Sequence, residues 1–124
     1  MFMFSDHLPV PSDATLVVPI PATVTTKEEL LQALAKGLNL PTYFGWNWDA
    51  LEECLRDLSW IPFPRHILLF HEAVPFAEDS SDRSIYLDIL KQAAKDCRAG
   101  QHHELTVVFP TTFVLTPESD ITTD

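Results

Sequence analysis

Three short apolar runs separated by segments of helical periodicity constrain the fold of this chain more than any other feature. Residues 14–20 (ATLVVPI), 65–71 (RHILLFH) and 104–109 (ELTVVF) are each predicted to form a strand. Pro19 indicates that the first strand ends there or lies at a sheet edge, because proline cannot donate to the hydrogen-bond ladder. Strands that alternate with helices predict an α/β fold: a small three-stranded parallel sheet packed with helices and joined by right-handed crossovers.

Two helices are predicted between the first two strands. Thr26 and Glu29 have the spacing of a capping box, and the leucines that follow recur every four residues and form one apolar face. Pro41 disfavours a helical residue before it, so the first helix is expected to end near Asn39.

A second helix is predicted over residues 48–58, with Asn47 as its N-cap. Its apolar residues follow the i, i+3, i+4, i+7 pattern: Leu51, Cys54, Leu55 and Leu58. The opposite face then carries three acids and one base: Asp49, Glu52, Glu53 and Arg56. A third helix is predicted over residues 83–97, capped by Ser81 or Asp82.

The length of 124 residues and the hydrophobic fraction of 46% suit one domain over 1–124, with a core at about 14–109 and two peripheral ends. The N-terminus lacks the features of a secretory signal and no apolar run is long enough to span a membrane, so a cytoplasmic location is expected. Cys54 and Cys97 form no CxxC pair, and we expect both thiols to be reduced.

The acidic charge balance favours some partners over others. With 18 Asp and Glu against 8 Lys and Arg, the formal net charge is −10. Such a surface repels phosphate groups, so direct binding of nucleic acid or of an anionic membrane is not expected, whereas association with a basic protein is favoured. Composition alone leaves open that the charge serves only solubility.

The acids of the second helix stand beside a group of aromatic residues. Asp49 and Glu53 are one helical turn apart with Glu52 flanking them, and the repulsion among them destabilises the helix slightly. A solvated helix face is one interpretation. The aromatic neighbours favour a binding surface, because not all of them can lie in the core: Tyr43, Phe44, Trp46, Trp48 and Trp60.

An enzymatic site is a further alternative. Two acids flanked by aromatic rings have the composition of a carbohydrate site, but paired catalytic acids usually come from different elements with different environments. His66 and His71 lie at the two ends of one strand, and His102 and His103 are adjacent, so neither pair has metal-ligand spacing. We therefore expect no catalytic residues, no metal and no cofactor.

Residues 43–55, YFGWNWDALEECL, resemble a segment of the barstar family: tyrosine, an aromatic residue, Gly-x-Asn-x-Asp-Ala-Leu, then an acid and Cys-Leu. The preceding LNLP and the whole order of elements over about 14–109 are similar too. The resemblance implies an intracellular inhibitor of a small basic ribonuclease. In this family the second helix and the connector before it enter the nuclease active site, with carboxylates where substrate phosphates would lie.

The resemblance also implies which residues bind the partner. Glu53 falls where the family places its central carboxylate, an aspartate, and is one methylene longer. The full candidate set is Tyr43, Gly45, Trp46, Asn47, Trp48, Asp49, Glu52, Glu53, Arg56 and Gln92. Four of these depart from the family: Trp46 and Trp48 replace a glutamate and a leucine, Glu52 a tryptophan, and Gln92 a contacting glutamate. Such changes suit a different ribonuclease or a non-nuclease target.

Three functions follow as hypotheses. The first is a ribonuclease inhibitor that protects its host cell. The second is a barstar-like interaction or immunity module for a different basic partner, such as a related or unrelated toxin protein or a regulatory subunit. The third is an enzyme that uses Asp49 and Glu53 on a carbohydrate, which predicts turnover of glycans. The sequence leaves the first two open.

Overall fold

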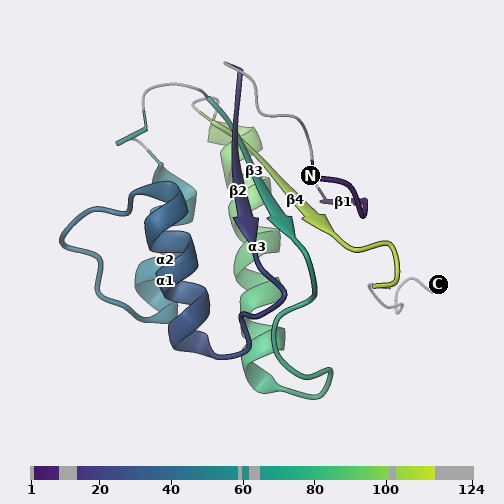
Figure 1. Ribbon diagram of the computed structural model, residues 1–124. Helices are drawn as coiled ribbons and strands as arrows, with labels where there is room; N and C mark the ends of the chain where they lie inside the picture. Colours follow the sequence, from purple (N-terminus) through teal and green to yellow (C-terminus); the bar gives the residue numbers. More distant parts are fainter. Residues whose placement is uncertain (1, 9–13, 59, 62–64, 101–102, 114–124) are drawn as a thin grey trace.

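The computed structural model describes residues 2–8, 14–58, 60–61, 65–100 and 103–113. The elements in chain order are β1 Phe2–Phe4, β2 Thr15–Ile20, α1 Lys27–Leu38, α2 Trp48–Asp57, β3 His66–His71, α3 Ser81–Gly100 and β4 Glu104–Phe109 (Figure 1). Within these residues no helix is both long and apolar enough to cross a membrane.

The strands form one parallel sheet in the order β1-β4-β3-β2. The predicted three-stranded sheet is therefore wrong by one strand. The fourth is β1, which pairs Phe2 with Val107 and Met3 with Val108, so the N-terminal end is not peripheral at these residues. A strand of three residues is too short to show a period-2 pattern, and its pairing with β4 joins opposite ends of the chain.

The position of Pro19 agrees with the sequence prediction. β2 lies at one edge of the sheet, and Pro19 lies inside it, paired in register with Phe70. Because β2 has a neighbour on one side only, the missing amide hydrogen of a proline is tolerated there.

The main core lies between one face of the sheet and the helices. Figure 1 shows α3 behind the strands, with α1 and α2 together on the β2 side. Alternate strand residues meet the helix leucines in this core, among them Val18, Ile67, Leu69 and Val107. The other face carries a smaller apolar cluster of Leu68, Phe70 and Val108, with Val17 packed against it. Burial on both faces explains why β3 and β4 read as continuous apolar runs.

The ends of α1 and α2 follow local sequence signals closely. Thr26 and Glu29 form the expected capping box, and Asn39 ends α1 in a left-handed conformation. α2 ends one residue earlier than predicted, with Leu58 as its left-handed cap. α3 begins at Ser81 and continues to Gly100, so the predicted range of 83–97 was too short at both ends. The predicted caps Ser81 and Asp82 both lie inside α3. Ser80, the residue before the helix, accepts a hydrogen bond on its Oγ from Asp82 N.

Candidate protein-binding surface

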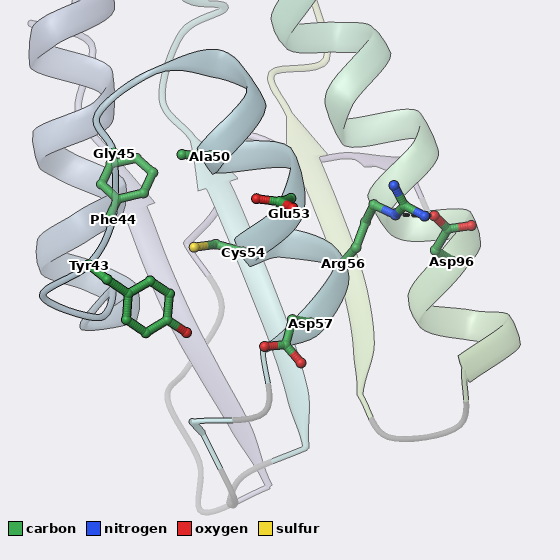
Figure 2. A pocket seen from close by; sticks show the side chains of 9 residues that line it. All are labelled: Tyr43, Phe44, Gly45, Ala50, Glu53, Cys54, Arg56, Asp57 and Asp96. Carbon is green, nitrogen blue, oxygen red and sulfur yellow. Dashed lines mark ion pairs between the residues drawn. The ribbon is translucent and has the colours of Figure 1, made fainter.

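Helix α2 and the connector before it (residues 41–47) border a hollow of about 640 Å³, here called the α2 hollow (Figure 2). The connector supplies Tyr43, Phe44 and Gly45. Helix α2 supplies Ala50, Glu53, Cys54, Arg56 and Asp57, and α3 supplies Asp96. The hollow is therefore lined by three acids and one base.

The amphipathic pattern of α2 determines what faces the hollow. Its predicted apolar stripe is buried: Leu51, Cys54, Leu55 and the cap Leu58. Asp49, Glu53 and Arg56 are exposed on the outer side, and Glu52 is half-buried. The predicted division of α2 into an apolar and a charged face is thus confirmed.

Asn47 holds the connector against the start of α2. Its Oδ1 accepts a hydrogen bond from Ala50 N at 2.8 Å, and its Nδ2 donates to Gly45 O at 3.3 Å. The predicted N-cap is confirmed. The side chain of Asn47 therefore has a structural role in shaping the surface.

Glu53 points into the α2 hollow, whereas Arg56, three residues later, turns toward α3 (Figure 2). Arg56 Nε lies 2.6 Å from Asp96 Oδ2, in an ion pair whose side chains are 51% and 37% exposed. In the part of the chain that the structure describes, neither Glu53 nor Asp49 has a hydrogen-bond or ion-pair partner for its carboxylate. These two charges are thus available to a group from outside the chain.

Asp96 is a site residue that the sequence reasoning missed. The predicted residue on α3 was Gln92, which is exposed but does not line the hollow. Asp96 follows Gln92 by one helical turn, so the i, i+4 spacing on a predicted helix was the signal that could have found it.

The aromatic residues near the hollow divide into exposed and packed side chains. Tyr43 is 76% exposed and Trp46 is 53% exposed, whereas Phe44 is buried. The Trp46 and Phe44 rings meet edge to face, with centroids 5.0 Å apart. Trp60 is half-buried and donates its indole N–H to Leu38 O at 2.9 Å. The expectation that not all these rings belong to the core is confirmed.

Trp48, a predicted contact residue, packs against α1, α3 and the segment before α3. It stacks on Tyr86 of α3 with centroids 6.2 Å apart, and its Nε1 donates to Asp82 Oδ1 at 3.4 Å. Its ring also meets Phe76 edge to face, and Lys27 Nζ of α1 lies 5.4 Å from its centroid. The half-buried Trp48 therefore joins the starts of the three helices.

A buried histidine lies beneath Trp48, beyond Tyr86. Because a carbonyl only accepts, His71 Nδ1 donates to Val108 O, at 2.9 Å. His71 Nε2 then accepts from the Tyr86 hydroxyl at 2.7 Å. Burial lowers the pKa of His71 to about 4, and burial raises the pKa of Tyr86. His71 is thus a neutral packing residue, stacked 4.4 Å from Phe109.

The remaining candidates for chemistry are accounted for by packing or lie outside the described residues. Cys54 is buried, and burial raises the pKa of its thiol, with the charges of Asp57 and Glu53 adding to that effect. The side chain of Cys97 and the whole of His102 lie outside the described residues, so the reduced state of both thiols stays a prediction. No cluster of His, Cys, Asp and Glu among the described residues could hold a metal ion.

The geometry also bears on the carbohydrate hypothesis. Asp49 and Glu53 are both exposed on one face of one helix. Catalysis by paired carboxylates relies on two environments that separate the protonation states of the acids. Here the two acids share one exposed environment, and exposed aromatic side chains lie on the preceding connector.

Residues 17–110 match the protein family described as Barstar (barnase inhibitor). The match runs from β2 to the end of β4 and contains α2, the connector and the whole α2 hollow. None of the curated proteins with which the chain was compared matches it significantly. Because the family match covers well over half of the 124 residues, the chain belongs to the barstar family.

Proposed function

We propose that this protein inhibits a small basic ribonuclease by inserting α2 and the connector into its active site, with no turnover and no cofactor. The observation that carries the proposal is the carboxylate of Glu53, which has no partner among the described residues and points into the α2 hollow while Arg56 is held by Asp96. A ribonuclease active site binds substrate phosphates through cationic side chains, and carboxylates can take the place of those phosphates.

The family description and the charge support the same proposal. The matching family is described as an inhibitor of barnase, and this chain has a net charge of −10. Attraction between an acidic inhibitor and a basic enzyme raises the rate of encounter. Glu53 is a glutamate where the family has aspartate, so the partner's cations would lie slightly deeper or be shifted.

A barstar-like module for a different basic protein is the second candidate. Trp46 is the observation that favours it, because an exposed tryptophan replaces the glutamate that the family has there. Such a change alters which partners fit, while the acidic helix is kept.

The test is to titrate the protein against barnase and a panel of other small basic ribonucleases, and to measure both RNA cleavage and the dissociation constant. Glu53→Ala should weaken binding to the inhibited enzyme by about 2 to 5 kcal/mol, roughly 30-fold to several thousand-fold, because the cations of the partner lose their counter-charge. The matched control is Glu52→Ala, which removes the same charge from a half-buried neighbour. The loss of affinity in Glu52→Ala should be much smaller than in Glu53→Ala.

The melting temperature of both variants should change little, because Ala favours helix and each change relieves repulsion on α2. Equal and small affinity losses in the two variants would mean that these acids form only a solvated helix face. Tight binding to a basic protein without ribonuclease activity would favour the second candidate.

A further inference from the structure

The three tryptophans of the chain differ in how their indole N–H groups are used. Trp48 donates to Asp82, and Trp60 donates to Leu38 O. Trp46 has no hydrogen-bond partner among the described residues, and it is 53% exposed. The fold therefore uses the polar group of two tryptophans and leaves the third available.

Trp46 also has a backbone conformation that a bulky residue rarely adopts. Among the described residues, four that are not glycine have positive φ, and three of these four have a role in the fold. Asn39 and Leu58 end α1 and α2, and Phe76 packs against Trp48. Trp46, with φ of 58°, ends no helix and is exposed.

The turn at position 46 does not require an indole. A left-handed conformation costs about 1 to 2 kcal/mol for most residues, and glycine or asparagine adopts it more easily. The neighbouring Gly45 is not in the left-handed region. A strained backbone that presents an exposed aromatic ring points to a contact outside the chain.

We propose that Trp46 anchors the partner by receiving an arginine side chain of that partner on the face of its indole ring. Trp46 precedes the exposed acids Asp49 and Glu53 by three and seven residues in the chain, and together with the net charge of −10 these acids favour a cationic occupant. Indole is the best aromatic acceptor for a cation, and a guanidinium stacks on it readily because it is weakly hydrated. Within this molecule, Lys27 already lies over the ring of Trp48.

The inference rests on the proposed function only in requiring a basic partner. It adds the residue that selects this partner and the side chain that the partner contributes. Because tryptophan and arginine are the residues that most often dominate interfaces, one such contact can decide which basic protein binds.

The backbone argument is tested by stability. Trp46→Gly and Trp46→Asn should melt at an equal or higher temperature, by up to about 3 to 6 °C, because both residues accept the left-handed conformation. Leu58→Gly is the matched control, since Leu58 has φ of 52° but is fully buried, and its loss should lower the melting temperature. A clear fall for both Trp46 variants would overturn the strain argument.

The binding argument is tested with a ribonuclease from the panel that binds the intact chain. Trp46→Asn and Trp46→Leu should each lower affinity by about tenfold or more, whereas Trp46→Phe, which keeps an aromatic face, should lower it less. Full affinity of Trp46→Leu would show that an apolar pocket holds the indole and would overturn the arginine contact. Full affinity of Trp46→Asn would overturn the whole inference while leaving the proposed function intact.

A second probe separates the inference from the proposed function. A hexa-arginine peptide should shift the indole N–H resonance of Trp46 more than those of Trp48 and Trp60, and more than a hexa-lysine peptide does. If no ribonuclease binds while the arginine peptide still shifts this resonance, the proposed function fails and the inference stands. The absence of a selective shift at Trp46 would contradict the inference.

Discussion

At the residue scale, Gly37 and Gly45 differ in whether the fold requires a glycine. A Cβ on Gly37 would lie 2.3 Å from Val18 Cγ1, so the packing of α1 against β2 requires glycine. A Cβ on Gly45 would lie 3.4 Å from Asn47 Nδ2 and 3.5 Å from the Ala50 Cβ, which are ordinary contacts. The fold itself does not require glycine at position 45.

We therefore expect Gly45→Ala to fold with unchanged or slightly higher stability, by about 0.4 to 1 kcal/mol, because the unfolded chain loses freedom. Affinity for the partner should fall, because the added methyl group would stand between the connector and the partner. Gly37→Ala is the control. It should lower the melting temperature, because the added Cβ meets Val18, while the fraction that remains folded should bind with unchanged affinity. Thermal melts and dissociation constants check both, and undiminished affinity of Gly45→Ala would place the connector backbone outside the interface.

Residue roles were predictable from the sequence where they depend on one helix, and unpredictable where they depend on contacts between elements. The periodicity of α2 placed Glu53 opposite Leu51 correctly. No local pattern could show that Arg56 pairs with Asp96 across two helices, or that the left-handed residue of the connector is Trp46.

At the element scale, the ion pair between α2 and α3 controls the charge beside Glu53. With Arg56 held by Asp96, its positive charge is directed away from the acids of α2 (Figure 2). A half-exposed pair of this kind contributes only about 0 to 1 kcal/mol to stability. Its effect on the charge pattern of the surface is the larger consequence.

Asp96→Asn should release Arg56 toward Glu53 and weaken binding to a basic partner, with little change in melting temperature. Asp88→Asn is the control, because it removes the same charge from an exposed residue of the same helix. Both variants change long-range attraction alike, so the difference between their dissociation constants reports Arg56. Identical constants would mean that Arg56 does not affect the interface.

Elements with local start and stop signals were predicted well. The capping box at Thr26 and the N-cap Asn47 depend on residues within one turn, and both are present. Strand β1 has no such signal, because its three residues are ordered by pairing with β4. The strand order likewise follows from contacts across the whole chain.

At the scale of the whole molecule, the proposed binding surface rests on a chain of contacts between buried and half-buried side chains. Trp48 stacks on Tyr86, whose hydroxyl donates to His71, and His71 in turn donates to β4 through Val108 O. This links the start of α2 to the carboxyl end of the sheet. Neutral His71 satisfies both of its neighbours, whereas a protonated imidazole would lose its acceptor for the Tyr86 hydroxyl.

The stability of the molecule should therefore depend on pH through His71. Burial lowers its pKa from 6.5 to about 4, so between these values the unfolded chain binds a proton that the folded chain does not. The contribution of neutral His71 to stability is therefore fully present above about pH 6.5 and is lost as the pH falls toward 4. Between pH 7 and pH 5 the free energy of unfolding should fall by about 2 kcal/mol from this cause. Hydrogen bonds lower the pKa values of Asp6 and Glu29, so these two groups lose their contributions to stability only at more acidic pH.

Urea unfolding of the protein at pH 7 and at pH 5 checks the contribution of His71. The control is His71→Gln, because glutamine can still donate and accept a hydrogen bond but does not titrate. The loss of stability of this variant between pH 7 and pH 5 should be about 2 kcal/mol smaller than that of the unchanged protein. Equal losses in the two proteins would show that other groups cause the pH dependence.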